Sequence, residues 1–363
     1  MAGRIRHLIP GGNTSKGFYS YYDYIIEKDA NRIFVIKGGP GVGKSSMMKK
    51  IGQEMLDKGY DVEYHHCSSD NDSLDGLVIP KLNVAFLDGT APHVVDPKNP
   101  GAVDEIIHLG DYWDLDKMEA NKKEILEINT EVGKLFKRAY KYLGAARPIL
   151  ESIIERNTEA MDFGKVNVET YKLINEIFED IPVSKNAGEI RHLFGSAYTP
   201  NGWVEYTDSV LEDAKNVYYI NGDAGSGKTT LFTKVFNEAI ASGFDVEVYH
   251  TPLIPERIET IYIPKLKIGL TSSEIFRRNN YKTLNLNGLL DQNKISKYKD
   301  QIDFDKRIFV ELIDRGIQNI SMAKKKHDLM EQYYVPNMDF AKVENLRGNL
   351  IKRVLRYEEN SGE

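Results

Sequence analysis

Two octapeptides in this chain have residue types and spacing suited to holding phosphate. Gly38–Ser45 and Gly222–Thr229 both match the pattern GxxxxGK[ST], and the second begins 184 residues after the first (222 minus 38). Glycines let consecutive backbone N–H groups turn toward phosphate oxygens, because a side chain there would collide with them. The lysine of this pattern reaches the β- and γ-phosphates, and the Ser or Thr hydroxyl ligates Mg²⁺. The pattern therefore predicts two sites for ATP, or another nucleoside triphosphate, with Mg²⁺.

The predicted nucleotide-binding residues are those of the two loops and the hydroxyl residue after each loop. In the first loop they are Gly38, Gly39, Pro40, Gly41, Val42, Gly43, Lys44, Ser45 and Ser46. In the second loop they are Gly222, Asp223, Ala224, Gly225, Ser226, Gly227, Lys228, Thr229 and Thr230. Lys44 is also predicted to be catalytic, and Ser45 and Thr229 are predicted metal ligands.

The segments around each loop predict the same order of elements. An apolar strand precedes each loop, at Ile33–Ile36 and Val217–Ile220, and a helix follows it, at about 44–58 and 228–242. Further strands are expected at 61–67 and 83–87 in the first half, and at 245–251 and 267–270 in the second. Strands that alternate with helices predict an α/β fold with a parallel sheet flanked by helices.

The whole chain is an internal duplication. Ile5–Leu8 returns as Ile190–Leu193, and Ile79–Leu82 returns as Ile263–Leu266. A period this long indicates two tandem domains rather than a solenoid of short repeats. We predict a first domain at 1–185, with a helical segment at about 104–180. The second domain is predicted at 186–363, with its helical segment at about 285–357.

Each helical segment carries an apolar stripe at spacings of three and four. In the first half the stripe consists of Ile125, Ile128, Val132, Leu135, Ala139, Tyr142 and Ala146. Such spacing is typical of one face of a long helix. Two interpretations are open: a protruding hairpin that contacts a protein partner, or a helix packed on its own domain. The second is favoured, because fewer than four clean heptads are present.

An apolar strand that ends in Asp88 has the form of a Walker B element. A carboxylate at that strand end lies across from the phosphate loop and holds Mg²⁺ through water. Asp88 is therefore predicted as a metal ligand and a catalytic residue. The loop that follows contains His93, for which contact with the γ-phosphate or substrate and a structural role are equally open.

The segment after the second strand contributes three more carboxylates, Asp70, Asp72 and Asp75. One of them could polarise a water or accept a proton, and Asp75 is the predicted catalytic residue among them. The chain's single cysteine, Cys67, precedes them and is interpreted as a small buried filler rather than a nucleophile.

The second half departs from this pattern, because Ser272 stands where the first half has Asp88 (88 plus 184). We therefore predict a catalytic first site and a binding or regulatory second site. Arg6 and Arg191, at matching places, are candidates for an arginine finger, and the pair at 277–278 competes with them. Phe18 and Trp203 are candidates for stacking on a base.

Composition limits the alternatives. The 363 residues suit two domains, and the net charge of −6 argues against nucleic acid as a partner. No apolar stretch approaches the length of about 20 residues that spans a bilayer. A single cysteine excludes an intramolecular disulfide, so we expect a cytoplasmic protein.

The two loops and Asp88 resemble the P-loop NTPase superfamily. Their tandem arrangement, with Ile5–Leu8 repeated at the head of each half, is similar to a family of duplicated bacterial ATP-binding proteins whose function is uncharacterised. The loop pattern does not tell which reaction follows, so three functions are open. An ATPase is preferred, and the alternatives are a kinase for a small molecule or nucleotide and a non-hydrolysing sensor. Gly89 follows Asp88, where many P-loop ATPases have a glutamate base, and this absence adds weight to the kinase.

Overall fold

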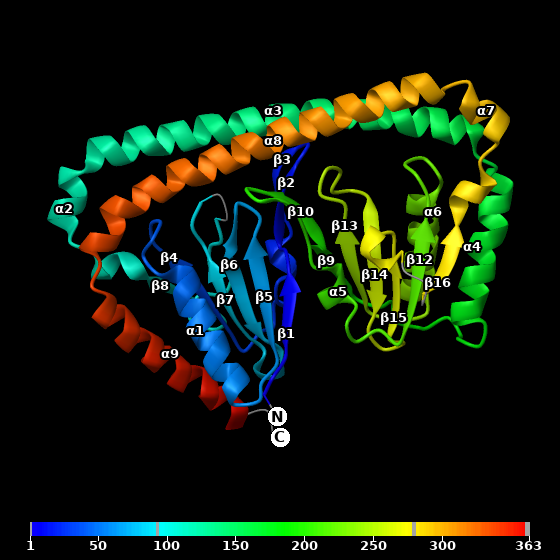
Figure 1. The fold of residues 1–363 in the computed structure, drawn as a ribbon. Coiled ribbons are helices and arrows are strands. Elements are labelled where there is room, and N and C mark those ends of the chain that lie inside the picture. Colours follow the sequence, from blue (N-terminus) through cyan, green and yellow to red (C-terminus); the bar gives the residue numbers. More distant parts are fainter. Residues whose placement is uncertain (1, 92–93, 278–280, 360–363) are drawn as a thin grey trace.

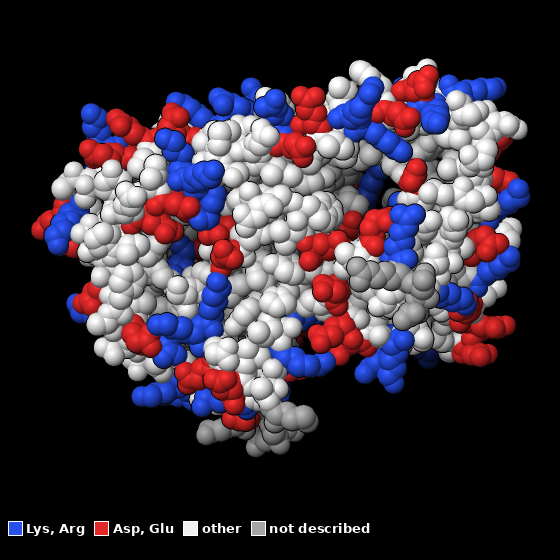
Figure 2. Space-filling view, in the orientation of Figure 1, with Lys and Arg blue, Asp and Glu red and all other residues white. Residues whose placement is uncertain are grey.

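The computed structural model describes residues 2–91, 94–277 and 281–359. Two α/β units lie side by side, and a pair of long helices runs across both of them (Figure 1). Within the described residues, none of the helices combines the length and the apolar character that crossing a bilayer requires. Acidic and basic side chains are interspersed over the face of the molecule that Figure 2 shows.

Each unit contains a six-stranded sheet, and both sheets have the same order of strands. The first sheet runs β1 (Ile5–Leu8), β5 (Val62–Cys67), β6 (Asp70–Ile79), β7 (Val84–Asp88), β4 (Arg32–Lys37) and β8 (Asp104–His108). The second runs β9 (Ile190–Phe194), β13 (Val246–His250), β14 (Ile258–Ile263), β15 (Ile268–Thr271), β12 (Asn216–Asn221) and β16 (Lys282–Asn285). The duplication in the sequence is thus a duplication of a complete sheet.

The sheets are mixed, which corrects the expectation of a parallel sheet. Strand β6 is antiparallel to both of its neighbours, and β14 is antiparallel to both of its own. All other pairings within the two six-stranded sheets are parallel. The reason is local: β5 turns back at once into β6, with Cys67 paired to Asp70. A connection this short can join only antiparallel strands. The segment at 70–75, which follows the second predicted strand, therefore begins a further strand that was not predicted. The order of strands is also not the usual one for a P-loop sheet.

Helix α1 (Lys44–Asp57) follows the first loop and α6 (Lys228–Ala241) follows the second. Each helix starts after a glycine with a left-handed backbone, Gly43 with φ 95° and Gly227 with φ 92°. A residue with a Cβ would be strained at such a position, which explains why the pattern has glycine there. The short strands β2 (Gly11–Thr14), β3 (Gly17–Ser20), β10 (Ser196–Thr199) and β11 (Gly202–Glu205) form one hairpin in each half.

The helical segments begin later than expected in the first half, because residues 104–108 pair with β4 as strand β8. The helices there are α2 (Leu115–Ala120), α3 (Lys122–Ala160) and α4 (Phe163–Phe178). The second half contains α5 (Thr207–Val210), α7 (Gln292–Ser296), α8 (Lys299–Tyr334) and α9 (Phe340–Glu359). Single turns of 3-10 helix lie at Tyr22–Tyr24, Pro80–Leu82, Leu109–Tyr112, Glu274–Phe276, Leu286–Leu289 and Val335–Asn337.

The two long helices α3 and α8 run antiparallel, side by side, over both sheets (Figure 1). Leu143 and Ala146 of α3 pack with Ile313 and Ile320 of α8 in a buried cluster. Gly316 lies so close that a Cβ there would stand 2.8 Å from Leu143. The apolar stripe on α3 therefore packs against α8, its counterpart from the other half of the chain. This arrangement is neither a free hairpin nor a helix packed on its own domain alone.

The last helix of each half packs on the sheet of the other half. Helix α4 places Val166 and Ile174 in one core with Phe232 of the second unit. Helix α9 places Leu350 and Val354 in the core of the first unit, which is built around the sheet of β4 and β7. Each spatial unit is therefore completed by helices from the opposite half of the sequence.

Ion pairs at matching positions join the two units. Arg6 of β1 hydrogen-bonds Glu247 of β13 at 2.8 Å, and Arg191 of β9 hydrogen-bonds Glu63 of β5 at 2.9 Å. Both glutamates are buried, so these charges are paired as buried charges must be. Arg6 and Arg191 are thus engaged in ion pairs between the two units rather than at either GxxxxGK[ST] loop.

Candidate functional site

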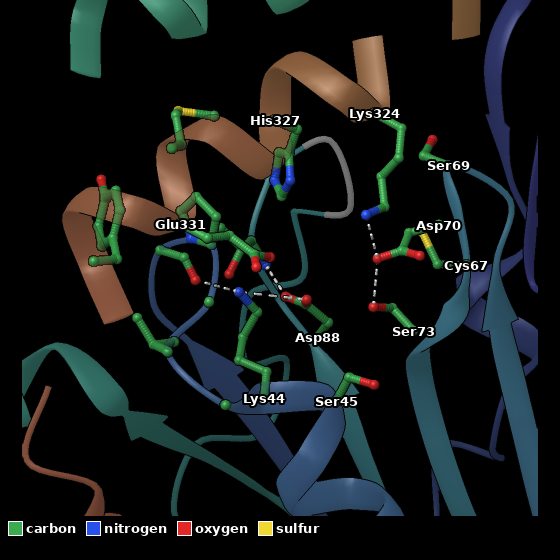
Figure 3. Close-up of a pocket in the computed structure, with 18 of the residues that line it drawn as sticks. Lys44, Ser45, Cys67, Ser69, Asp70, Ser73, Asp88, Lys324, His327 and Glu331 are labelled. Atoms are coloured by element: carbon green, nitrogen blue, oxygen red, sulfur yellow. Dashed lines mark hydrogen bonds and ion pairs between the residues drawn. The ribbon is translucent and has the colours of Figure 1, made fainter. Parts of the chain in front are cut away.

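The first phosphate loop wraps around the ammonium group of Lys44. Its Nζ atom donates hydrogen bonds to the carbonyl oxygens of Gly38 and Gly39, both at 2.9 Å. The same Nζ lies 3.6 Å from Oδ2 of Asp88, whose strand β7 runs parallel to β4 (Figure 3). Loop, lysine and aspartate therefore meet at one point, as the sequence pattern predicts.

Asp88 is oriented by its own turn. Its Oδ1 atom accepts a hydrogen bond from the backbone N–H of Thr90 at 2.8 Å, and the Thr90 hydroxyl donates to the Gly38 carbonyl at 2.9 Å. The Ser45 hydroxyl oxygen accepts a hydrogen bond from the N–H of Leu74 at 3.0 Å. Carboxylate and hydroxyl oxygens are the hard donors that Mg²⁺ prefers, so this donor set fits a magnesium ion.

A cavity of about 720 Å³ opens over this loop. Its walls are the loop itself, the start of β6, the first part of α3 and the last part of α8. On the β6 wall, Asp70 accepts a hydrogen bond from Ser73 at 2.8 Å, and Asp72 is exposed. Asp75 also lines the cavity and is buried, with 2% of its surface exposed.

Asp75 lies beside two other buried groups. Burial raises the pKa of the Tyr22 hydroxyl well above its usual range, and the Asp75 carboxylate adds to that rise. The pKa of the Cys67 thiol is raised by the same two causes, in the same order. Cys67 is therefore kept as a neutral thiol, which suits a filler and not a nucleophile.

Helix α8 brings three ionisable side chains over the first loop, Lys324, His327 and Glu331 (Figure 3). Lys324 lies 3.5 Å from Asp70 across the cavity. Burial lowers the pKa of His327 and raises the pKa of Glu331, so both side chains are shifted toward their neutral forms. These residues were not among those predicted from the sequence, because they come from the other half of the chain.

Three side chains on α8 could in addition hold a metal ion. The ligand atoms of His327, Asp328 and Glu331 lie within 4.8 Å of one another. Asp328 is at the same time in an ion pair with Lys324, so one of the three donors is already engaged.

The second loop repeats the arrangement of the first. The Nζ atom of Lys228 donates to the carbonyl of Gly222, and burial lowers the pKa of this lysine. Asn157 of α3 donates from Nδ2 to the carbonyl of Ala224 at 2.7 Å. A cavity of about 520 Å³ lies over the loop, and Thr229, Thr230 and Ser272 are on its wall.

The second cavity has a carboxylate on its wall, although Ser272 holds the place of Asp88. Glu259 of β14 lines the same cavity, and its backbone oxygen accepts a hydrogen bond from the N–H of Ser272 at 3.0 Å. Burial raises the pKa of Glu259 to about 7, although a hydrogen bond from Ser196 and the charge of Lys228 oppose the rise. Glu259 is the counterpart of Asp75 (75 plus 184), a signal that the aligned repeat already contained.

The helices that cover the two loops differ in chemistry. Where α8 has His327 and Glu331 over the first loop, α3 has Leu150 and Ile154 over the second, 177 positions earlier (327 minus 150). Packing is close in both cases: a Cβ at Gly39 would stand 2.3 Å from Tyr334, and one at Gly225 would stand 2.6 Å from the Ile154 carbonyl oxygen. The covering helices thus pack closely on both loops, but only α8 places ionisable side chains at these two positions.

Among the remaining predicted residues, those that the structure describes do not line the first cavity. His93 lies outside the described residues, as does one arginine of the pair at 277–278. Arg277 pairs with Glu274 at 3.2 Å. Phe18 packs in a core cluster with Tyr22, whereas Trp203 is about half exposed and lines the second cavity.

No protein-family model, no curated protein and no solved structure matches this chain. The two loops and the side chains around them are therefore the basis for inferring a function.

Proposed function

We propose that this protein is a P-loop NTPase that binds ATP, or another nucleoside triphosphate, with Mg²⁺ at both loops and turns it over at the first. The observation that carries the proposal is the geometry shared by Lys44 and Lys228. Each lysine follows a strand and a glycine loop, begins a helix, and points its Nζ atom back onto the loop carbonyls. A glycine loop followed by a helix N-terminus is the arrangement that binds phosphate, and this favours a phosphate site over an ordinary turn between a strand and a helix.

In the first site the described side chains have separate roles. Lys44 would neutralise the β- and γ-phosphates, while Ser45 and Asp88 would hold the magnesium ion, which would supply charge stabilisation. In hydrolysis a water attacks the γ-phosphorus, the bond to the β–γ bridging oxygen breaks, and the nucleoside diphosphate leaves. The proton of the water passes to a carboxylate, and Asp75 and Glu331 are candidates on the cavity wall.

The second site is proposed to bind nucleotide without efficient turnover. Lys228 and Thr229 preserve the means of holding phosphate and metal, but the cover of the loop is apolar at Leu150 and Ile154. It therefore lacks the charges that α8 brings to the first loop. Nucleotide at this site would act as a ligand that changes how the two units are arranged, through the helices that contact both cavities.

A binding and turnover assay tests the proposal directly. Calorimetric titration with ATP and MgCl₂ should show two sites per chain, and phosphate release should depend on Mg²⁺. No nucleotide binding to the wild-type protein at millimolar ATP, GTP, CTP or UTP would refute the proposal.

A phosphotransferase is the second candidate, and one observation favours it. The cavity extends from Lys44 to a wall that contains Asp70 and Asp72. This wall is a polar surface on which a second substrate could bind. A kinase would bind its acceptor there and accept the hydroxyl proton on one of these carboxylates. Phosphate release without any acceptor favours the NTPase, whereas turnover only with an added acceptor favours the kinase.

A further inference from the structure

A β-bulge occurs at the same place in both sheets. Between β13 and β14, Tyr249 pairs with Thr260 and His250 pairs with Ile258, so Glu259 is the extra residue. Between β5 and β6, His65 pairs with Gly76 and His66 pairs with Leu74, so Asp75 is the extra residue. Bulges of this kind are common beside functional sites, because they change the direction of one side chain. In both halves the residue that the bulge sets apart is a carboxylate on the wall of the phosphate-loop cavity.

Glu259 lies beside the position that corresponds to Asp88. Strands β14 and β15 are antiparallel, with Thr260 opposite Thr271, and the bond from Ser272 N–H to the Glu259 carbonyl continues that ladder by one residue. Ser272 holds the place of Asp88 at the end of the strand beside β12. The second site therefore has its carboxylate one strand away from the usual place, and a glutamate side chain is one methylene longer than that of aspartate.

The surroundings of Glu259 suit a carboxylate that faces a cation. Its Oε2 atom accepts a hydrogen bond from the Ser196 hydroxyl at 2.8 Å, which holds the side chain in one orientation. Among the described residues, Ser196 is the one side chain that hydrogen-bonds this carboxylate. Lys228 is close enough for their charges to interact, and Thr229 lines the same cavity. The hydroxyl of Thr229 and the carboxylate of Glu259 are hard oxygen donors, so they fit Mg²⁺.

We infer that Glu259 is the carboxylate that faces the magnesium ion of a nucleotide bound at the second loop, in the role that Asp88 has at the first. This inference rests on the proposed function, because it needs a nucleotide at the second loop. It follows that the second site distinguishes the magnesium complex of a nucleotide from the free nucleotide, although Ser272 has replaced the aspartate.

The test measures binding at the second loop rather than activity. A non-hydrolysable ATP analogue is titrated calorimetrically in a Lys44→Ala background, with MgCl₂ or with EDTA. Mg²⁺ should tighten binding by about tenfold or more, and Glu259→Gln should reduce that gain to about twofold, because losing a group that supports a metal site typically costs about tenfold or more in metal affinity. Adding Ser272→Asp to the Glu259→Gln variant restores a carboxylate at the first-half position and should recover the gain. Glu205→Gln is the matched control, because Glu205 is a neighbouring glutamate outside the cavity lining.

Two results would overturn the inference in different ways. If Lys228→Ala in the same background leaves binding unchanged, the second loop does not hold nucleotide, and the proposed function fails together with the inference. If Lys228→Ala abolishes binding but Glu259→Gln keeps the full effect of Mg²⁺, the inference alone fails. Thermal melting of each variant shows that the comparison is made between folded proteins.

Discussion

Lys44 of the first loop and Asp88 at the end of β7 form a partly buried ion pair, with Nζ 3.6 Å from Oδ2. The same Nζ donates to two loop carbonyls at 2.9 Å, so the ammonium group occupies the centre of the loop. A bound phosphate would replace the loop carbonyls and Asp88 as the partner of this lysine. Asp88 would then pair with a metal ion in place of the lysine. Both residues are therefore kept in place by partners that a nucleotide and Mg²⁺ would replace.

The two loop lysines should differ in their effect on turnover. Lys44→Ala removes the charge that faces the γ-phosphate at the catalytic site, and we expect turnover to fall by about 10²-fold or more, as for loss of one preorganised electrostatic contact. Lys228→Ala should leave first-site activity, with a changed dependence on ATP concentration. Lys50→Ala is the matched control, because Lys50 is an exposed lysine of α1 paired with Glu344. Steady-state phosphate release measures all three, and equal residual activity in Lys44→Ala and Lys228→Ala would contradict the asymmetry.

Asp88→Asn should separate binding from turnover. The amide keeps the shape of the side chain but removes the negative charge that faces the metal, so the concentration of Mg²⁺ needed for half-maximal activity should rise. Turnover at saturating Mg²⁺ should fall by about tenfold or more, on the scale seen when groups around a metal are lost. A magnesium titration of activity, with nucleotide binding measured in parallel, checks this. Wild-type behaviour throughout the titration would place the metal carboxylate elsewhere, with Asp75 the first alternative.

The charged cover of the first loop can be exchanged for the apolar cover of the second. The double change His327→Leu with Glu331→Ile gives α8 the residues that α3 has at Leu150 and Ile154. Because both native side chains are partly buried with shifted pKa values, the folded protein should tolerate the exchange. We expect turnover to fall by about tenfold or more while nucleotide binding persists. Leu329→Gln, at an exposed position of the same helix, is the control, and unchanged turnover in the double variant would show that α8 only covers the loop.

Local patterns predicted the elements that a single stretch of sequence can encode. The strands before the loops, the helices α1 and α6 and the place of Asp88 all follow from a motif, a glycine with positive φ and an apolar run. Strand β6 was missed because its first residues are polar, and only the pairing with β5 makes them a strand. Lys324, His327 and Glu331 could not be found from local spacing, since they reach the first loop through a helix that crosses from the other half. Glu259 could have been found, because it aligns with Asp75 in the repeat.

Acid should destabilise the protein through two histidine pairs at the junction of the units. His250 bonds His192 at 2.9 Å and stacks on Tyr21 of the other half, with ring centres 4.8 Å apart. His66 is arranged in the same way, with His7 at 2.8 Å and Tyr206 of the other half at 4.6 Å. Burial, and then the neighbouring histidine, lowers the pKa of His250 to about 3 and that of His66 to about 4.

Both folded-state pKa values therefore lie below the ordinary value of about 6.5, so the unfolded chain binds more protons as the pH falls from 6.5. The stability that the neutral imidazoles contribute is present above pH 6.5 and is lost progressively as the pH falls toward about 4 for His66 and about 3 for His250. For each histidine the free energy of unfolding should decrease by up to about 1.4 kcal/mol per pH unit in that range. Urea unfolding between pH 7 and pH 5 measures this slope, and His250→Phe should make it shallower. An identical slope in His250→Phe and the wild type would show that this histidine does not couple the units to pH.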